Sequence, residues 1–426
     1  MRAPLRWLAG GAATAAALGA VLVVQGRRPG TLAAAGPADT AITSRSIAYF
    51  EKRLVSNPDN YMVKSRLVSR YVLRFGTGAD PADVARAEAL ARDLVHTVPE
   101  RGAALSRLSG VLLMQHKFAQ SLDAATEALA LDSLGQDALG AWFDAALAVG
   151  RYGEAETALA RLRPGTLAAQ VRRAQWLDAS GRSEAAYDTF DRICRQLERS
   201  GQRPPVVAWC LTQLAAVEHA HRGPDAAAAL WRRALQVQPG YRGALEGLGG
   251  LAAARGEWSR AAELYARIAV DAHPDLYLRV AEAAAAVGDS VHAKQYERRF
   301  LTVAGRPENE ALFGEVLALF YAERGPPWGR DSALALALRD LTRRPTVESY
   351  DVLSWVRYLR GEPVQALAAS DRAQHWGSPN PTMDYHRARI LEALGRGTEA
   401  ALFLHRALAH PTLLPPHVRR DLASRP

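Results

Sequence analysis

Few side chains in this sequence have the types and spacing that chemistry needs, and the two cysteines come first among them. Cys194 and Cys210 are the only cysteines in the chain. A structural zinc site normally takes four clustered cysteine or histidine ligands, so we expect no metal site. Cys194 ends one predicted helix and Cys210 opens the next, so the two could be neighbours. We expect two separate buried thiols, with a disulfide as the alternative in an oxidising compartment.

Motifs for a cofactor or for catalysis are weaker still. Residues 247–252 (GLGGLA) match G-x-G-x-x-A, but a dinucleotide site needs a preceding strand and a βαβ unit, and this stretch lies within a predicted helix. His219 and His221 are two residues apart and do not share a helix face. No H-E-x-x-H, P-loop or G-x-S-x-G motif occurs. We therefore predict no catalytic residues, no cofactor and no metal.

The elements that position these side chains come from an internal repeat. A small residue recurs at thirty-odd residue intervals, three of which are 34 residues long, and in six of eight cases a glycine precedes it by five residues. The recurring small residues are Ser121, Ala155, Ala186, Ala227, Ala261, Ala293, Ala366 and Ala400. A fixed period with a fixed small residue indicates a repeat solenoid, in which each unit packs on its neighbours.

Residues 242–274 show how one unit is built. Leu245, Leu248 and Ala252 fall on one face of a first helix. Gly256 ends that helix, because glycine tolerates the left-handed conformation found at helix C-termini. A second helix follows with Ala261 on its inner face, and His-Pro at 273–274 ends it. Small residues in both helices allow a close approach.

This pattern resembles the tetratricopeptide repeat family, which reads W-x2-L-G-x2-Y, then A-x3-F, then P. Here residues 245–252 read L-x2-L-G-x2-A and residues 261–265 read A-x3-Y, while residues 227–231 read A-x3-W before Pro239. The resemblance covers roughly residues 45–412. It implies an all-α fold, a right-handed α-solenoid of about ten helix-turn-helix repeats. Outside the solenoid we expect a C-terminal cap or tail at 413–426.

The N-terminal residues predict membrane targeting. A basic start precedes an apolar stretch from Trp7 to Val24, whose length as a helix is close to the hydrocarbon thickness of a bilayer. We assign 1–25 to a signal peptide or signal-anchor helix, and 26–44 to a flexible linker. The counts of flanking positive charges favour repeats outside the cytoplasm, either secreted to the periplasm or tethered to the membrane. An inner-membrane anchor with cytoplasmic repeats is the alternative.

Charge and composition restrict the choice of partner. The net charge is +9, but acidic and basic residues alternate through the predicted helices without a long basic stripe. A nucleic-acid partner usually requires such a stripe, so we predict none. The alanine- and arginine-rich usage is typical of a GC-rich, bacterial-style coding sequence.

The resemblance implies that first helices line a concave face that binds a partner. We predict a scaffold or adaptor of the cell envelope that holds another protein or a peptide segment there, and not an enzyme. A membrane-anchored cytoplasmic adaptor is the alternative, and an enzyme with an unrecognised groove site is a third reading. The residues expected to be exposed on the concave face are Arg172, Gln175, Gln213, Glu246, Glu282, Trp355, Tyr385 and Arg389. Exposed aromatic residues are frequent in binding hot spots, which makes Trp355 and Tyr385 the strongest candidates.

Overall fold

Every regular element that the computed structural model describes is a helix, over residues 37–78, 81–271, 273–325, 329–373 and 380–423. From α3 to α22 these helices form ten consecutive pairs, as expected for about ten repeats. A single helix, α2, precedes the pairs, and a short helix, α23, follows them. The predicted all-α fold, a right-handed α-solenoid of tetratricopeptide type, is confirmed.

The first helices of the pairs are α3 (Tyr61–Gly78), α5 (Arg101–Met114), α7 (Gln136–Ala148), α9 (Leu167–Ala179), α11 (Pro204–His221), α13 (Arg242–Ala254), α15 (Asp275–Ala286), α17 (Glu310–Arg324), α19 (Val347–Leu359) and α21 (Pro381–Ala393). The second helices are α4 (Pro81–Thr97), α6 (Phe118–Leu131), α8 (Tyr152–Arg161), α10 (Ser183–Arg199), α12 (Pro224–Val237), α14 (Trp258–Ala266), α16 (Ser290–Ala304), α18 (Gly329–Arg343), α20 (Pro363–Ala373) and α22 (Gly397–Leu408). The flanking helices are α2 (Pro37–Ser56) and α23 (Pro416–Ala423), with 3-10 turns η1 (Pro307–Asn309) and η3 (Pro411–Leu413).

The turn glycines end first helices as the repeat predicts. Gly256 has φ +77°, a value that side chains with a Cβ rarely adopt. Its amide donates to the carbonyl of Ala253 at 3.2 Å, and the next amide, of Glu257, donates to Ala252 at 2.9 Å. These bonds satisfy carbonyls at the end of α13 that have no partner within the helix.

Small residues bring the two helices of a pair into contact. Ala261 in α14 is fully buried, at 0% exposure. A Cβ built at Gly249 in α13 would lie 2.6 Å from Cε1 of Tyr265, closer than real Cβ atoms come to a neighbour. The glycine of the repeat pattern is therefore required by packing, which also explains why residues 247–252 resemble a nucleotide motif without forming one.

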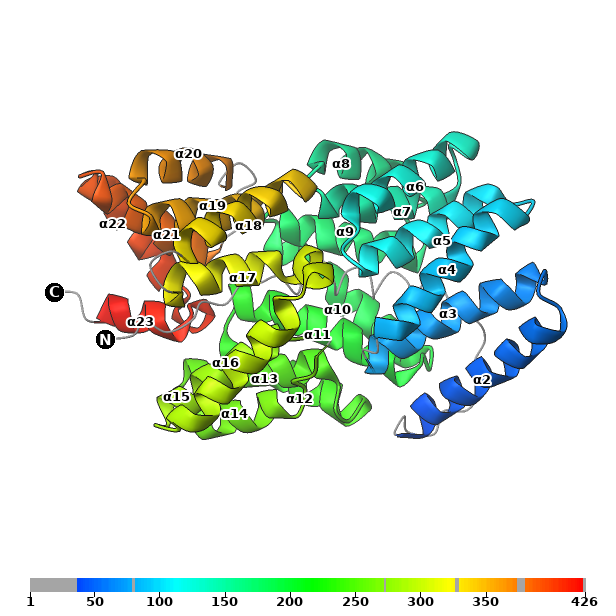
Figure 1. Ribbon diagram of the computed structural model, residues 1–426, viewed down its shortest axis with the longest axis horizontal. Coiled ribbons are helices and arrows are strands. Elements are labelled where there is room, and N and C mark those ends of the chain that lie inside the picture. Colours follow the sequence, from blue (N-terminus) through cyan, green and yellow to red (C-terminus); the bar gives the residue numbers. More distant parts are fainter. Residues whose placement is uncertain (1–36, 79–80, 272, 326–328, 374–379, 424–426) are drawn as a thin grey trace.

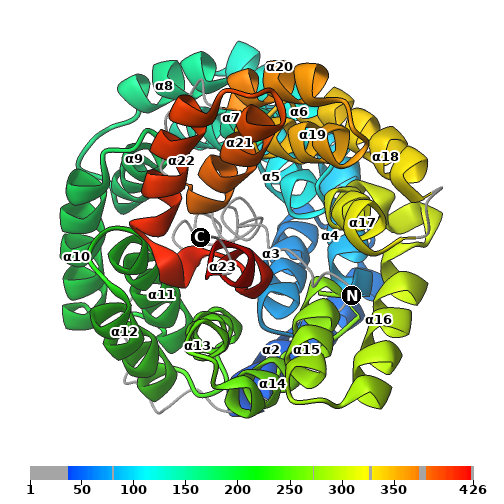
Figure 2. The ribbon, with the colours of Figure 1, turned by 90° about the vertical axis from the view of Figure 1, so that its left-hand side faces the viewer.

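The pairs wind into a superhelix around a central axis (Figure 1). Seen along this axis, first helices such as α11 and α13 lie on the inner side, and second helices such as α10, α12 and α16 lie outside (Figure 2). The inner surface of the winding is the concave face. The short helix α23 lies inside the ring of helices (Figure 2).

The superhelix also closes upon itself. The Tyr152 hydroxyl at the start of α8 accepts a hydrogen bond at 3.3 Å from the amide of Val347 at the start of α19. The guanidinium of Arg344 lies 5.6 Å from the centroid of the Phe118 ring. A Cβ at Gly150 would lie 2.6 Å from the carbonyl oxygen of Pro345. Repeats that are separated by 195 residues, as in that hydrogen bond, are therefore in contact.

Two sequence-based expectations need correction. Cys194 and Cys210 form a disulfide with a Cα–Cα distance of 5.5 Å, instead of remaining separate thiols, because α10 and α11 pack side by side with both residues in the contact. The helical region begins at Pro37, within the stretch 26–44 expected to be a linker. Proline is favoured at the first position of a helix, and the residues after it continue α2.

Membrane targeting was predicted from residues that lie outside the described part of the chain, which begins at residue 37. Among the helices from α2 onward, none combines the length and the apolar character needed to cross a bilayer.

Candidate concave-face site

All of the residues predicted for the concave face lie on first helices, but most of their side chains are buried. Arg172, Gln175, Glu282, Trp355 and Tyr385 are buried, with exposures between 5% and 9%. The other three, Gln213, Glu246 and Arg389, are partly buried. The expectation of exposed side chains is therefore wrong for the five buried residues, because they pack against neighbouring helices, as Arg172 does on Asp144 of α7 and Trp355 does on Tyr385 of α21. Their role in binding a partner stays a prediction.

Charged residues on this face pair between neighbouring first helices. Arg172 of α9 forms an ion pair with Asp144 of α7 at 2.6 Å and donates to the carbonyl of Gly140 at 3.2 Å. Burial raises the pKa of Asp144, and the Arg172 guanidinium opposes that rise. Ion pairing of this kind holds adjacent repeats together and reduces the charge that is free to meet a ligand.

Charges farther along the face also pair, between first helices in one case and within a single helix in the others. Glu246 of α13 pairs with Arg279 of α15 at 3.0 Å and with Arg242 at 3.5 Å. Arg389 of α21 pairs with Glu392 at 2.9 Å. These contacts assign structural roles to charges that the sequence alone suggested as binding groups.

Gln175 differs from these residues. It is 9% exposed, and neither its Oε1 nor its Nε2 atom has a hydrogen-bond partner among the described residues. A buried amide without partners costs free energy, on the order of 1–3 kcal/mol. Such a group is suited to bind a polar atom that enters the concave face.

Trp355 and Tyr385 belong to a buried aromatic cluster. The Trp355 indole stacks on the His386 ring, with centroids 4.6 Å apart, and lies 5.9 Å from the Tyr385 ring. The Asp351 carboxylate lies 2.8 Å from Nδ1 of His386. The two aromatic residues therefore pack within the C-terminal repeats, where the sequence analysis expected exposed hot spots.

The C-terminal segment, residues 411–423, occupies part of the concave face. Arg419 of α23 donates to the carbonyls of Ala254 and Ala253, the last two residues of α13, at 2.9 Å in the second case. A cation at this position also interacts favourably with the negative end of the helix dipole. The Tyr385 hydroxyl of α21 donates to Asp421 at 3.0 Å. The segment thus connects the middle of the solenoid to its last repeat.

Apolar and neutral contacts complete the surface that holds residues 411–423, which we call the seat of the C-terminal segment. Leu414 and Val418 are 3% and 0% exposed, and Leu422 packs against the same core. Nε2 of His219 in α11 lies 3.1 Å from the Thr412 hydroxyl. Burial, together with Arg255 and His410, lowers the pKa of His219 to about 4, so its ring is neutral at pH 7 and can share this hydrogen bond.

The sequence holds one signal for the C-terminal helix. Val418 and Leu422 are four residues apart, which places them on one helix face, and Leu414 stands just before a pair of prolines at which the helix begins. The pattern indicated an amphipathic helix but did not indicate which surface it covers.

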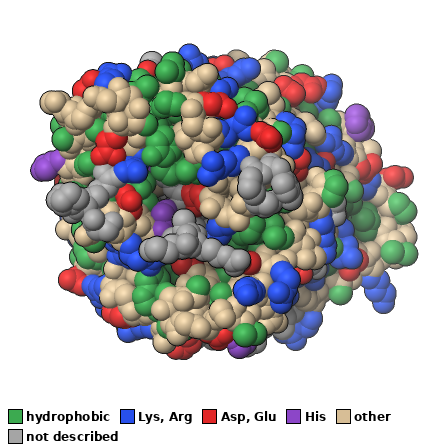
Figure 3. Space-filling model, turned by 60° about the vertical axis from the view of Figure 1, so that its left-hand side comes forward, with side chains coloured by type: hydrophobic (Ala, Val, Ile, Leu, Met, Phe, Trp, Pro, Cys, Tyr) green, Lys and Arg blue, Asp and Glu red, His purple; other side chains and the backbone are tan. Residues whose placement is uncertain are grey.

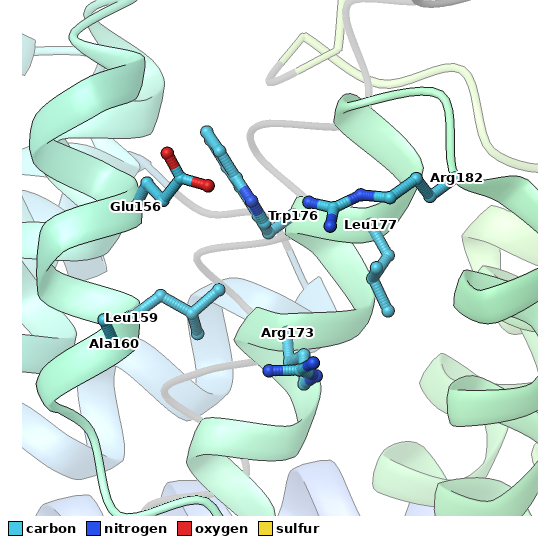
Figure 4. A pocket seen from close by; sticks show the side chains of 7 residues that line it. All are labelled: Glu156, Leu159, Ala160, Arg173, Trp176, Leu177 and Arg182. Carbon is cyan, nitrogen blue, oxygen red and sulfur yellow. The ribbon is translucent and has the colours of Figure 1, made fainter.

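A separate cleft lies between α8 and α9 and is lined by Glu156, Leu159, Ala160, Arg173, Trp176, Leu177 and Arg182 (Figure 4). Glu156 and Arg182 point toward the Trp176 ring from opposite sides (Figure 4). Its volume is about 170 Å³, below the roughly 300–1,000 Å³ of typical small-molecule sites. The cleft is too small to hold a drug-sized ligand or a cofactor.

The outer surface carries both signs of charge. Acidic and basic side chains are intermixed over the face seen in Figure 3, without a continuous patch of one sign. Among the described residues, no group of three or more histidine, cysteine or acidic side chains is placed to hold a metal ion. The predicted absence of a nucleic-acid partner stays a prediction.

The chain matches no known family profile and no characterised protein sequence. Among solved structures it is similar to a human IFIT1 dimer with m7Gppp-AAAA, at TM-score 0.48 and 13% identity over 88% of this chain and 87% of that one. A human IFIT1 dimer with PPP-AAAA gives TM-score 0.47 and 12% identity over 93% and 94% of the two chains. The helix pairs and their turn glycines define the chain as a tetratricopeptide-type α-solenoid.

Proposed function

We propose that this chain is a protein-binding scaffold whose concave face holds a helical segment of another protein. The observation that carries the proposal is the seat of the C-terminal segment. A short helix contacts α13 and α21 through Arg419 and Asp421 and buries Val418 completely. This is a peptide-like ligand bound to first helices, by the mode in which an amphipathic helix lays its apolar face against a groove.

We further propose that the scaffold works in the cell envelope, outside the cytoplasm. The Cys194–Cys210 disulfide supports this location, because disulfides persist in oxidising compartments and are rare in the cytosol. The apolar stretch from Trp7 to Val24 supports it from the sequence. A membrane-anchored adaptor with cytoplasmic repeats is the alternative, and cysteines that stay reduced in cells would favour it.

Site-specific photo-crosslinking in cells tests which face binds the partner. A photo-reactive residue at Gln213 in α11, partly buried and predicted for the concave face, should give a discrete crosslinked product with another protein. The matched control is Arg232 in α12, an exposed position on the second helix of the same repeat. We expect no discrete product there, because second helices lie on the outer side. Products at Arg232 and none at Gln213 would place the binding face outside and refute the proposal.

A further inference from the structure

The C-terminal segment differs from the helices before it in what holds it. It follows α22 and 3-10 turn η3 (Pro411–Leu413) and returns across the solenoid to α11 and α13. Its contacts with α13 lie more than 160 residues away in sequence. Each helix from α3 to α22 is one of a pair packed against its sequence neighbours, whereas α23 rests on the concave face.

The polar contacts of this segment are few and of a kind that another peptide could make. The Arg419 guanidinium binds two main-chain carbonyls, of Ala253 and Ala254, so this contact requires no particular side chain from α13. Further bonds of the segment run from the Tyr385 hydroxyl to Asp421 and between His219 and Thr412. Any helix that presents an arginine and a carboxylate at the same spacing could make the first two contacts.

The electrostatic setting favours a basic group at this point. Burial lowers the pKa of Arg419, and the Glu282 carboxylate opposes that shift. Glu282 is itself 5% exposed. The Arg419 guanidinium binds two carbonyls at the negative end of the α13 dipole, so a bound segment gains from a cation there and from an apolar residue just before it.

We propose that residues 411–423 are a displaceable internal ligand, and that the partner protein binds the same seat with a helix of the same chemistry. This inference rests on the proposed function and specifies it. The partner segment carries a helix with apolar residues at the spacing of Val418 and Leu422, an extended apolar residue before the helix, as Leu414 is, and an arginine directly after the first apolar residue of the helix. In the resting chain the C-terminal segment competes with the partner and lowers its apparent affinity.

A synthetic peptide with the sequence of residues 411–426 and a fluorophore at its N-terminus tests this competition. The full chain with Val418→Asp should release its own segment, because a carboxylate cannot be buried without a partner. We expect this variant to bind the peptide at least ~10-fold more tightly than the wild-type chain does, since apparent affinity scales with the fraction of empty sites. The same peptide carrying Val418→Asp should not bind.

Arg420→Glu is the matched control, because Arg420 lies in the same helix but is exposed. This variant should bind the peptide no better than wild type. Equal peptide binding by wild type and a folded Val418→Asp chain would overturn the proposal.

If the Val418→Asp chain does not fold, hydrogen exchange of the wild-type chain decides. Amides of α23 that exchange faster than those of α21 support a displaceable segment. Amides of α23 that exchange only as slowly as those of α21 overturn it, since the segment then opens only with the repeats themselves. A peptide that fails to bind while Gln213 still crosslinks a partner refutes this inference alone. A peptide that binds while crosslinks form only at Arg232 refutes the proposed function and, with it, the partner helix of this inference, and leaves only the displaceable segment.

Discussion

Trp355→Ala should destabilise the C-terminal repeats by about 3–5 kcal/mol, the usual cost of truncating a buried tryptophan. The indole is 6% exposed and packs on three rings, those of His386, Tyr358 and Tyr385. In a solenoid the loss falls mainly on the repeats next to the change. Urea unfolding followed by circular dichroism should show an earlier transition for the C-terminal part of the chain.

Leu402→Ala in α22 is the control, because Leu402 is 59% exposed and its truncation should change stability little. If Trp355 were an exposed hot spot instead, Trp355→Ala would weaken partner binding and leave unfolding unchanged. An unchanged unfolding curve for Trp355→Ala would therefore contradict the buried aromatic cluster.

Loss of the disulfide should have a comparable effect. The bond joins residues separated by 16 positions, and closing a loop of this length stabilises the folded state by roughly 3 kcal/mol in the chain-entropy model. The double variant Cys194→Ala with Cys210→Ala should therefore unfold at lower urea concentration than the oxidised wild type. Both cysteines are at most 2% exposed, so a reductant should reduce the disulfide of the folded chain slowly.

Chemical reduction of the wild-type chain is the matched comparison, because it breaks the bond without changing a side chain. Reduced wild type and the double variant should unfold at similar urea concentrations. Alkylation of free thiols in protein trapped directly from cells shows whether the disulfide forms there. Alkylated Cys194 and Cys210 in that material would show that the bond does not form in the native compartment and would contradict the envelope location.

The local architecture can be predicted from the sequence, because the residues that specify each repeat lie close together in the chain. The glycine at 256 adopts the positive φ that ends α13, and Ala261 is buried as its place in the pattern predicts. Turn conformation and close packing of a helix pair depend on residues within one period. The repeat pattern therefore predicts the turn conformation and the helix packing without any tertiary contact.

The contact between distant repeats could not be predicted in the same way. Small rotations between successive repeats add up along the superhelix, and their sum brings Val347 against Tyr152. No local pattern encodes that sum. The burial of Trp355 and Tyr385 was missed for another reason, because the linear register does not show that Trp355 packs on rings of its own and the next repeat.

The pairing of the cysteines and the position of α23 depend on contacts between elements. A spacing of 16 residues permits either a bond or two thiols, and only the packing of α10 on α11 decides between them. The apolar spacing of Val418 and Leu422 indicates a helix, but the carbonyls of Ala253 and Ala254 that bind Arg419 have no sequence signature.

Hydrogen exchange of the Val418→Asp chain, compared with wild type, tests most directly whether the concave face holds a protein segment. Releasing the C-terminal segment should speed exchange at the end of α13, in the last turn of α11 and in α21, where its contacts lie. The second helices α12 and α14, in the same repeats, should keep their exchange rates. Faster exchange confined to α12 and α14, or no change in α13 and α21, would contradict binding on the concave face.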